Sequence, residues 1–562
     1  MPATRITVAL NANRTQKTPL LVPASASLDP SALNSIHTLV FNTARSKLRL
    51  KKPKRIFVAS LGTELLAEQD WRDTLKDDVI FLVSAGEEYI GLRKENNPDA
   101  NPDCPVYVLA QDAPVDELAI AQLKSTAQEL PGMVLATGQP DLCPGTKYPV
   151  GAVFVSQNWI HPPLIGSDIG CGMAWYKTKL SRHQVEGERG KRIAEKLQGL
   201  EGPWRTSVDR ENWLQDKSGN CSAGKEWDAS VGTIGRGNHF AEIQVVESIE
   251  LAEQEKIGLR PDDVILLVHS GSRGYGADIL KKYTAGSHVS LKEGNESMRL
   301  YMAEHDQAIR WAKANRDLIA VRFLACLEPG EEAWQSGRNA PTNGATIDSS
   351  IISQTKAMIR ERRVVDISHN NVERVKWPPS SQAQSAPAQP MVEEVADIPT
   401  IAMYGKDDDE TKQNYVYIHR KGAAPTWDAH TDVPLSILPL PGSRGTPTLM
   451  LKPTFSGHTN WGRNNALSLA HGSGRSMSRN KALSSLSAKY KKSSALLERS
   501  SRGGTWVICD EKDLVYEEAP EAYKDVYAVG RDLEHEEAAR IVGLCEPRIS
   551  YKVRDYIDFE MR

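Results

Sequence analysis

Two short β-branched segments that run into histidines constrain the fold of this chain more than any other feature. Residues 264–268 (VILLV) lead directly into His269, and residues 364–367 (VVDI) are followed two positions later by His369. A third histidine, His239, lies in the glycine-rich stretch 235–242 (GRGNHFAE). Active sites of α/β architectures collect at strand ends. The three histidines therefore predict one shared site at strand ends of a mixed α/β (α+β) fold.

A carboxylate and a thiol add metal-ligand character to this set. Asp168 and Cys171 are three positions apart in residues 166–173 (GSDIGCGM), where glycines let the backbone turn tightly. Both side chains can converge on one cation, and a thiolate has enough lone pairs to bridge two. For an isolated pair of this kind, the alternative interpretation is a buried cysteine beside a turn aspartate.

A further histidine is placed for covalent chemistry. His471 opens residues 471–475 (HGSGR), where an imidazole meets a flexible backbone and a guanidinium. A neutral imidazole can attack phosphorus and later leave it, as a two-step transfer requires. The glycine-rich segments 419–423 (HRKGA) and 441–446 (PGSRGT) can present backbone N–H groups to a nucleotide. Together these features indicate phosphoryl or nucleotidyl transfer.

Length and charge bound the partners and the compartment. A chain of 562 residues exceeds one usual core, so at least two domains are expected. Lys plus Arg (69) nearly balances Asp plus Glu (72), so nucleic-acid binding would depend on local basic patches. Seven scattered cysteines without a CxxC pair fit a reducing compartment, cytoplasmic or nuclear. No apolar run reaches the roughly 20 residues of a membrane span, so no membrane partner is expected.

Hydrophobic periodicity divides the chain into a small unit and a large one. Residues 1–95 predict strand, strand, helix, strand, strand, the order of a β-grasp domain, and residues 54–89 are similar to doublecortin-like domains. Residues 96–103 form the expected linker, and 104–562 the catalytic domain, with a helix over 297–318. The Pro/Ser/Gln-rich stretch 374–413 is interpreted as a disordered insertion. Basic runs lie at 45–55 and 479–492, and such runs are usually solvated faces.

Seven segments in fixed order identify a family. DIGCGM, GNHFAEI, HSGSRG, ISHN, HRKGA, PGSRGT and HGSGRSMSR all occur between residues 168 and 479. With them, the chain from about 104 to 552 resembles the RtcB-type RNA ligases. The resemblance implies a ligase that joins RNA 3′-phosphate or 2′,3′-cyclic phosphate ends to 5′-hydroxyl ends, in tRNA splicing or RNA repair.

The resemblance also implies roles for individual residues. One of two manganese ions would bind Cys171, His269 and His369, and the other Asp168, Cys171 and His239. His471 would carry GMP as a phosphoramidate. The implied GTP contacts are Asn238, His239, Glu242, His369, Asn370, Pro441, Gly442, Ser443, Arg444, Thr448, His471, Gly472, Ser473, Gly474 and Lys552.

The sequence departs from the family pattern near the nucleotide. Arg444 stands where many members have methionine, and ten residues follow Lys552. Two alternative hypotheses remain: an RNA-end-binding scaffold without ligation, and a metal-dependent phosphodiesterase that needs neither GTP nor His471. The RNA substrate, the need for an activating protein partner and the oligomeric state stay open.

Overall fold

The computed structural model describes most of the chain in two compact units. The described residues are 4–14, 16–22, 33–59, 62–66, 70–71, 74–75, 79–90, 99–216, 219–235, 237–285, 290–339, 345–377, 415–490, 504–509 and 511–553. The smaller unit comprises residues 1–105, 116–133 and 144–149. The larger unit comprises residues 106–115, 134–143 and 150–562.

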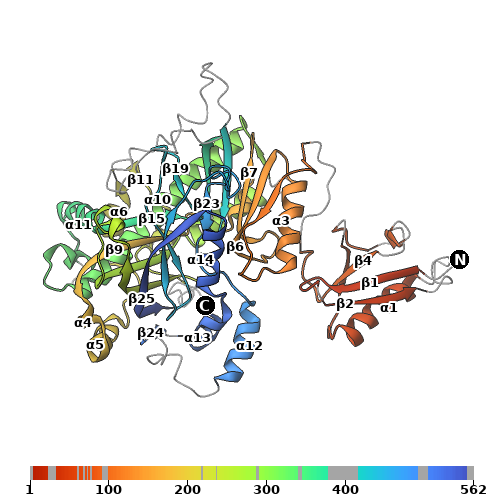
Figure 1. The fold of residues 1–562 in the computed structure, drawn as a ribbon, viewed down its shortest axis with the longest axis horizontal. Helices are drawn as coiled ribbons and strands as arrows, with labels where there is room; N and C mark the ends of the chain where they lie inside the picture. Colours follow the sequence, from red (N-terminus) through yellow and green to blue (C-terminus); the bar gives the residue numbers. More distant parts are fainter. Residues whose placement is uncertain are drawn as a thin grey trace. The chain divides into compact units, whose positions relative to one another are not determined.

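The N-terminal strands form the β-grasp arrangement that the sequence predicts. The elements are β1 (Thr4–Leu10), β2 (Lys17–Val22), α1 (Leu33–Lys47), β3 (Arg55–Val58) and β4 (Ile80–Ser84). The sheet order is β2-β1-β4-β3, with β1 and β4 parallel at its centre. Helix α1 lies against this sheet (Figure 1). Its apolar side chains contribute to a hydrophobic core within these elements.

The large unit is built on an eight-stranded sheet, and it confirms the mixed α/β class. Its path is β15-β9-β13-β12-β25-β22-β21, with β24 paired to β25. Every pairing is antiparallel except that of β24 with β25. The strands are β9 (Gly172–Ser181), β12 (Phe240–Ile249), β13 (Asp263–Ser270), β15 (Arg363–Ser368), β21 (Leu438–Pro441), β22 (Thr448–Pro453), β24 (Trp506–Cys509) and β25 (Ala539–Lys552).

A second sheet of five strands has the order β16-β17-β7-β6-β5. Its strands are β5 (Val106–Val108), β6 (Met133–Cys143), β7 (Val150–Ser156), β16 (Asn370–Lys376) and β17 (Tyr415–Lys421). The short strand β18 (Ala423–Pro425) pairs with β23 (Ser468–Ala470), so the segments around Gly422 and His471 are neighbours. The other two-stranded pairs are formed by β8 (Trp159–Ile160), β10 (Gln215–Asp216), β11 (Gly219–Asn220), β14 (Leu291–Lys292), β19 (Trp427–Asp428) and β20 (Val433–Pro434).

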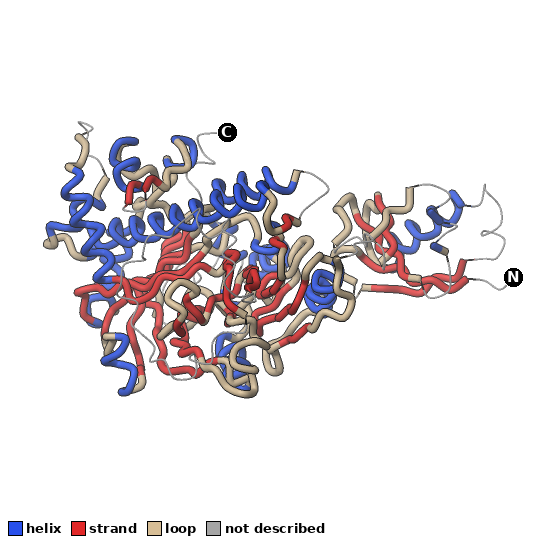
Figure 2. Tube along the Cα trace, turned by 90° about the horizontal axis from the view of Figure 1, so that it is seen from above, coloured by secondary structure: helices blue, strands red, loops and turns tan. Residues whose placement is uncertain are grey.

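One long helix supports the large sheet. The sequence predicts a helix over 297–318, and α10 spans Glu296–Leu327. It packs against β9 and β13, and a long helix crossing the strands is visible in Figure 2. The other helices are α3 (Glu117–Glu129), α4 (Arg182–Val185), α5 (Gly187–Leu197), α6 (Ser207–Leu214), α7 (Lys225–Asp228), α8 (Leu251–Ile257), α9 (Gly274–Thr284), α11 (Ser349–Arg362), α12 (Arg479–Lys489), α13 (Lys512–Glu517) and α14 (Val526–His535).

The predicted insertion at 374–413 begins too early. Residues 374–376 belong to β16, which is paired with β17 over its whole length. Val375 is buried within this strand, and a β-branched residue favours strand structure. The rest of the insertion, from residue 378, lies outside the described residues. Among the described residues, no helix is long and apolar enough to cross a membrane.

Candidate active site

The predicted metal ligands lie together at one end of four neighbouring strands. Cys171 directly precedes β9, and His239 directly precedes β12. His269 is the penultimate residue of β13, and His369 separates β15 from β16. Because these strands are antiparallel, the site uses the beginnings of two strands and the ends of two others. It is therefore not the carboxyl edge of a parallel sheet.

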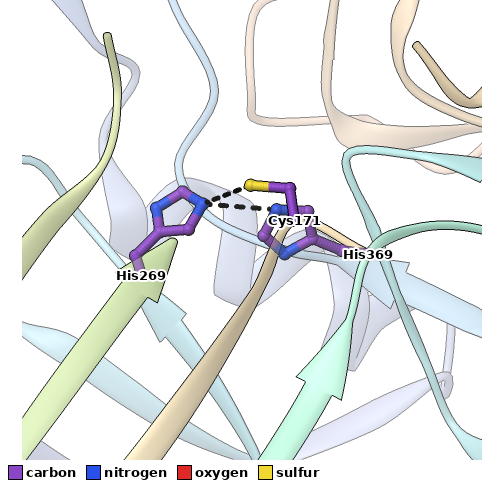
Figure 3. Close-up of side chains that lie close together, drawn as sticks. All are labelled: Cys171, His269 and His369. Carbon is purple, nitrogen blue, oxygen red and sulfur yellow. Dashed lines mark hydrogen bonds between the residues drawn. The ribbon is translucent and has the colours of Figure 1, made fainter. Parts of the chain in front are cut away.

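The ligand atoms form two overlapping groups. One contains Cys171, His269 and His369, the other Asp168, Cys171 and His239, and within each group the atoms lie within 4.8 Å of one another. The Sγ atom of Cys171 lies 3.3 Å from Nε2 of both His239 and His269. Nε2 of His269 lies 3.3 Å from Nε2 of His369 (Figure 3). The sulfur belongs to both groups, so it is placed to bridge two cations.

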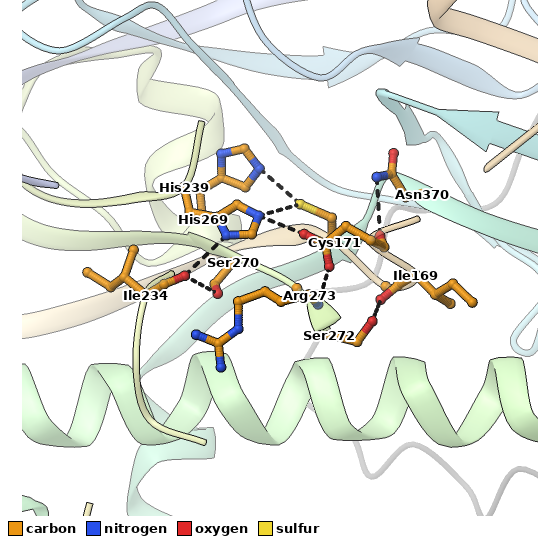
Figure 4. A network of polar contacts seen from close by, with 12 residues as sticks. Ile169, Cys171, Ile234, His239, His269, Ser270, Ser272, Arg273 and Asn370 are labelled. Atoms are coloured by element: carbon orange, nitrogen blue, oxygen red, sulfur yellow. Dashed lines mark hydrogen bonds and ion pairs between the residues drawn. The ribbon is translucent and has the colours of Figure 1, made fainter. Parts of the chain in front are cut away.

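The protonation states of the histidines fit metal binding. Burial, and then the neighbouring histidines, lower the pKa of His269 well below its ordinary value. Burial also lowers the pKa of His369, so both rings are neutral at neutral pH. Nδ1 of His239 lies 3.1 Å from the carbonyl oxygen of Ile234 (Figure 4). Such a contact fixes Nδ1 as the protonated nitrogen and leaves Nε2 as a lone-pair donor.

The carboxylate and the thiol complete a donor set that suits divalent cations. Burial opposes ionisation of Asp168, but His239 and the backbone N–H of Arg273 outweigh it and lower the pKa of Asp168. The N–H of Arg273 donates to Oδ1 of Asp168 at 2.5 Å. Burial, and then the charge of Asp168, raise the pKa of the Cys171 thiol well above its ordinary value. A bound cation would displace that proton, because metals bind the thiolate.

A buried arginine on α10 fixes the segments that carry the ligands. The guanidinium of Arg316 donates to the carbonyl oxygens of Gly170 and Ser270 at 2.8 and 2.9 Å. Its Nε donates to Oδ1 of Asp366 at 2.8 Å, and both side chains are 1% exposed. The contacted residues flank Cys171 and His269 and precede His369. One side chain therefore sets the spacing of three predicted ligands.

His471 lies beside this cluster and is oriented by a buried carboxylate. Its ring centroid is 4.5 Å from that of His369. Its Nδ1 lies 2.8 Å from Oδ2 of Asp141, whose side chain is fully buried on β6. An aspartate at Nδ1 holds the imidazole in the tautomer whose Nε2 carries the lone pair. A Cβ on Gly474 would lie 2.3 Å from the carbonyl oxygen of Asp141, so this close approach requires glycine.

Glu242, one of the predicted GTP contacts, is a buried carboxyl group. Gln244 donates to Oε2 of Glu242 at 3.0 Å and to Oγ1 of Thr448 at 2.8 Å. Oε1 of Glu242 is buried without a hydrogen-bond partner. Burial raises the pKa of Glu242 to about 7, and the hydrogen bond from Gln244 offsets part of that effect. An unsatisfied buried acceptor is costly, so this oxygen is suited to the N–H groups of a ligand.

Two of the predicted GTP contacts, Lys552 and Arg444, are buried cationic side chains. Nζ of Lys552 donates to the carbonyl oxygen of His239 at 3.0 Å, and burial lowers its pKa to about 8. Arg444 donates through Nη2 to the carbonyl oxygen of Val515, while its Nη1 is buried without a partner. Oγ of Ser473 is also buried without a partner. These groups are available to an anionic ligand.

The remaining predicted GTP contacts help to hold the loops in place. Asn370 accepts from the N–H of Gly422 at 2.8 Å and donates to the carbonyl oxygen of Asp168 at 3.2 Å. The hydroxyl of Ser443 donates to the carbonyl oxygen of Glu518 at 2.8 Å. Asn238 is exposed. The N–H of Ser473 donates to the carbonyl oxygen of Pro441, the N–H of Gly442 donates to that of Pro447, and Gly472 packs on Pro441.

Three residues that the sequence analysis did not single out are central to the site. They are Asp141, Arg316 and Glu518. Glu518 accepts from Arg475 and Arg479 at 3.2 Å each and lies 3.8 Å from Nζ of Lys552. The sequence contains only a weak indication of two of these residues. Asp141 is an acid within a buried segment, and Arg316 is an arginine on the buried face of a predicted helix.

Comparison with known proteins gives consistent matches to one family. The family model described as tRNA-splicing ligase RtcB matches residues 122–221, 205–374 and 401–553. RNA-splicing ligase RtcB2 of Escherichia coli is 33% identical over 429 residues, which cover 76% of this chain and 90% of that protein. The tRNA-splicing ligase RtcB of Methanococcus maripaludis is 25% identical over 470 residues, which cover 73% of this chain and 88% of that protein. The family model begins after the β-grasp strands.

Proposed function

This chain belongs to the RtcB family, and we propose that it is a GTP- and manganese-dependent RNA ligase that joins 3′-phosphate or 2′,3′-cyclic phosphate ends to 5′-hydroxyl ends. The family match confirms the resemblance drawn from the seven motifs, and with it an RNA ligase of tRNA splicing or RNA repair. Beyond family membership, we propose that the nucleotide is GTP, that the metal is manganese, and that the joined ends are a 3′-phosphate or 2′,3′-cyclic phosphate and a 5′-hydroxyl.

One observation carries the proposal: an oriented histidine lies beside a two-cation donor set. His471 has its Nδ1 held by Asp141 and its ring next to that of His369. A histidine that belongs to neither ligand group is free to act as a nucleophile. With Nδ1 bound to the carboxylate, the lone pair on Nε2 is available for attack on phosphorus, as the proposed transfer requires.

The proposed reaction has three balanced steps. First, Nε2 of His471 attacks the α-phosphorus of GTP, the bond to the β-phosphate oxygen breaks, and pyrophosphate leaves. Second, a 3′-phosphate oxygen of RNA attacks the same phosphorus, and His471 leaves as neutral imidazole. Third, the 5′-hydroxyl oxygen attacks the RNA 3′-phosphorus, its proton passes to the phosphate of the departing GMP, and a phosphodiester bond forms. A 2′,3′-cyclic phosphate end would first be hydrolysed by water to the 3′-phosphate that enters the second step.

The buried carboxylate matches the charge that develops on the histidine. As Nε2 bonds to phosphorus, the ring gains positive charge, and Asp141 stabilises that charge through Nδ1–H. In the second step, the same aspartate holds the imidazole in place while it departs. Asp141 is a positioning residue, because it acts through His471.

The proposed cations use the donors described above. Cys171, His269 and His369 would hold one ion, and Asp168, Cys171 and His239 the other. When bound, two divalent ions neutralise phosphate charge and polarise the phosphorus–oxygen bonds under attack. Thiolate and imidazole donors favour zinc over manganese in affinity, so the choice of manganese rests on the resemblance to the family.

Covalent labelling tests this function directly. The protein is incubated with GTP labelled at the α-phosphate and with manganese, and the denatured protein is then assayed for label. We expect a label in the wild-type protein and none in His471→Ala. Addition of an RNA 3′-phosphate should discharge the label, and addition of a 5′-hydroxyl RNA should yield the joined product. Absence of a His471-dependent adduct would refute the proposal, and RNA cleavage by His471→Ala would favour the phosphodiesterase.

A further inference from the structure

The β-grasp unit carries a basic segment that the catalytic chemistry does not use. Residues 31–63 contain seven Lys and Arg and no Asp or Glu, whereas the whole chain has a net charge of −3. We call residues 45–54, from the last turn of α1 to the start of β3, the basic loop (Figure 1). Its six cationic side chains are all exposed: Arg45, Lys47, Arg49, Lys51, Lys52 and Lys54.

The basic loop is anchored to the unit by the residues between its cations. Leu48 and Pro53 are buried, and Leu50 is half-buried against the core of the unit. The N–H of Leu50 donates to the carbonyl oxygen of Ala44 at 3.1 Å. The N–H of Lys54 donates to the carbonyl oxygen of Ser84 at 2.8 Å. The buried residues hold the backbone, so the cationic side chains project from a fixed support.

No carboxylate neutralises these six cations in the described part of the chain. Three described acids of the same unit have other partners: Glu64 and Glu88 form ion pairs with Arg55, and Glu87 accepts from the N–H of Ala85. The second basic run differs in this respect, because Arg479 pairs with Glu518 and Lys489 with Glu521. Among the residues that the structure describes, the basic loop is therefore a concentrated positive surface without an acidic partner.

The composition of the loop selects the type of anion. It contains no aromatic side chain, so it offers no platform on which nucleic-acid bases could stack. Lysine and arginine without such platforms contact phosphates and do not read the base sequence. Because the large unit belongs to an RNA ligase family, a flexible chain of phosphates is present in its substrate.

We propose that the basic loop binds the phosphate backbone of the substrate RNA independently of its sequence. The contact retains an RNA end near the enzyme and raises its local concentration at the ligase site. The inference rests on the proposed function for the identity of the polyanion. It adds a substrate-binding surface outside the residues that match the family model.

The test compares the full-length protein with the triple variant Lys51→Gln/Lys52→Gln/Lys54→Gln. Binding of a fluorescent single-stranded RNA of mixed sequence is measured by anisotropy between 50 and 200 mM salt. Each phosphate contact contributes about −0.7 to the salt slope for single strands. If the variant loses three phosphate contacts, the decrease in its RNA affinity between 50 and 200 mM salt should be about twentyfold smaller than the decrease in the wild type. The KM for RNA in ligation should rise, with guanylylation of His471 unchanged.

A matched control removes equal charge elsewhere. Lys196→Gln/Lys225→Gln/Lys376→Gln neutralises three exposed lysines of the large unit and should leave the salt slope unchanged. Equal RNA affinity and salt slope in the wild type and the loop variant would overturn the proposal. So would a loop variant that loses affinity for polyglutamate but retains its affinity for RNA, since the partner would then be an acidic protein. Loss of guanylylation in the wild type would instead refute the proposed function.

Discussion

The pairing of His471 with Asp141 leads to a quantitative prediction for Asp141→Asn. The substitution keeps the size of the side chain and removes its charge at a fully buried position 2.8 Å from Nδ1. Formation of the GMP adduct should slow by roughly a hundredfold, with little change in the KM for GTP. The reason is that the aspartate opposes charge that appears on the ring only during attack.

The magnitude follows from the geometry. Opposite unit charges about 4 Å apart attract by about 4 kcal/mol at an effective dielectric constant near 20. An amide at this position would keep one ordinary hydrogen bond, which contributes about 1 kcal/mol. The difference, about 3 kcal/mol, corresponds to a rate change of roughly a hundredfold.

The rate of GMP-adduct formation is measured by single-turnover labelling with GTP. A second aspartate–histidine pair in the protein provides the control. Asp306 lies 2.9 Å from Nδ1 of His305, a buried histidine outside the site. Asp306→Asn removes a similar contact and should leave the rate of adduct formation unchanged. If Asp141→Asn labels within threefold of the wild-type rate while its thermal stability is unchanged, the role assigned to Asp141 is wrong.

Three further predictions address binding and stability. GTP affinity should fall as the pH drops below about 7, because protonation of Glu242 removes an acceptor for the guanine edge. Glu242→Gln should bind GTP weakly and without this pH dependence. Isothermal titration at pH 6 and 8 measures both affinities, and equal wild-type affinities at the two pH values would contradict the role of Glu242 as a guanine acceptor. Arg316→Met should lower the free energy of unfolding by about 3–5 kcal/mol, because it removes the 2.7 Å ion pair of the buried Asp366 and leaves that carboxylate only the longer 3.8 Å pair with Arg363. Urea denaturation measures the loss, and a loss below 1 kcal/mol would contradict this role of Arg316. Manganese at a concentration of a hundred times its dissociation constant should stabilise the folded protein by about 2.7 kcal/mol. The melting temperature should therefore rise with manganese in the wild type but not in Cys171→Ala. An equal rise in both proteins would exclude Cys171 as a ligand.

The elements of the fold that depend on local pattern were predictable from the sequence. The β-grasp strands and α10 follow from alternation and helical periodicity, which each segment specifies by itself. The predicted start of the insertion at residue 374 was wrong because it was based on amino-acid composition. Composition alone does not show that Arg374 to Lys376 continue the pairing of β16 with β17.

The convergence of the predicted ligands could also be predicted from the sequence, because each is a strong metal donor within two residues of a glycine or asparagine. The role of Asp141 could not, since this residue lies 330 positions from His471 and its role depends on where β6 meets β23 in space. Nor could the role of Arg316, since the helical pattern of α10 shows that its face is buried but not what that face contacts. The resemblance to the family supplied ligand identities, and only the coordinates supplied the side chains that orient them.

Arg316 explains how an antiparallel sheet can bring together the donors of the proposed two-cation site. In such a sheet, neighbouring strands enter and leave the same edge, so no common strand end sets the ligand positions. Here the guanidinium of Arg316 joins the segment before β9, the end of β13 and the strand β15 through hydrogen bonds. All three contacts are buried, and each lies within three residues of Cys171, His269 or His369. The relative positions of these ligands are therefore fixed by the core of the protein before any cation binds.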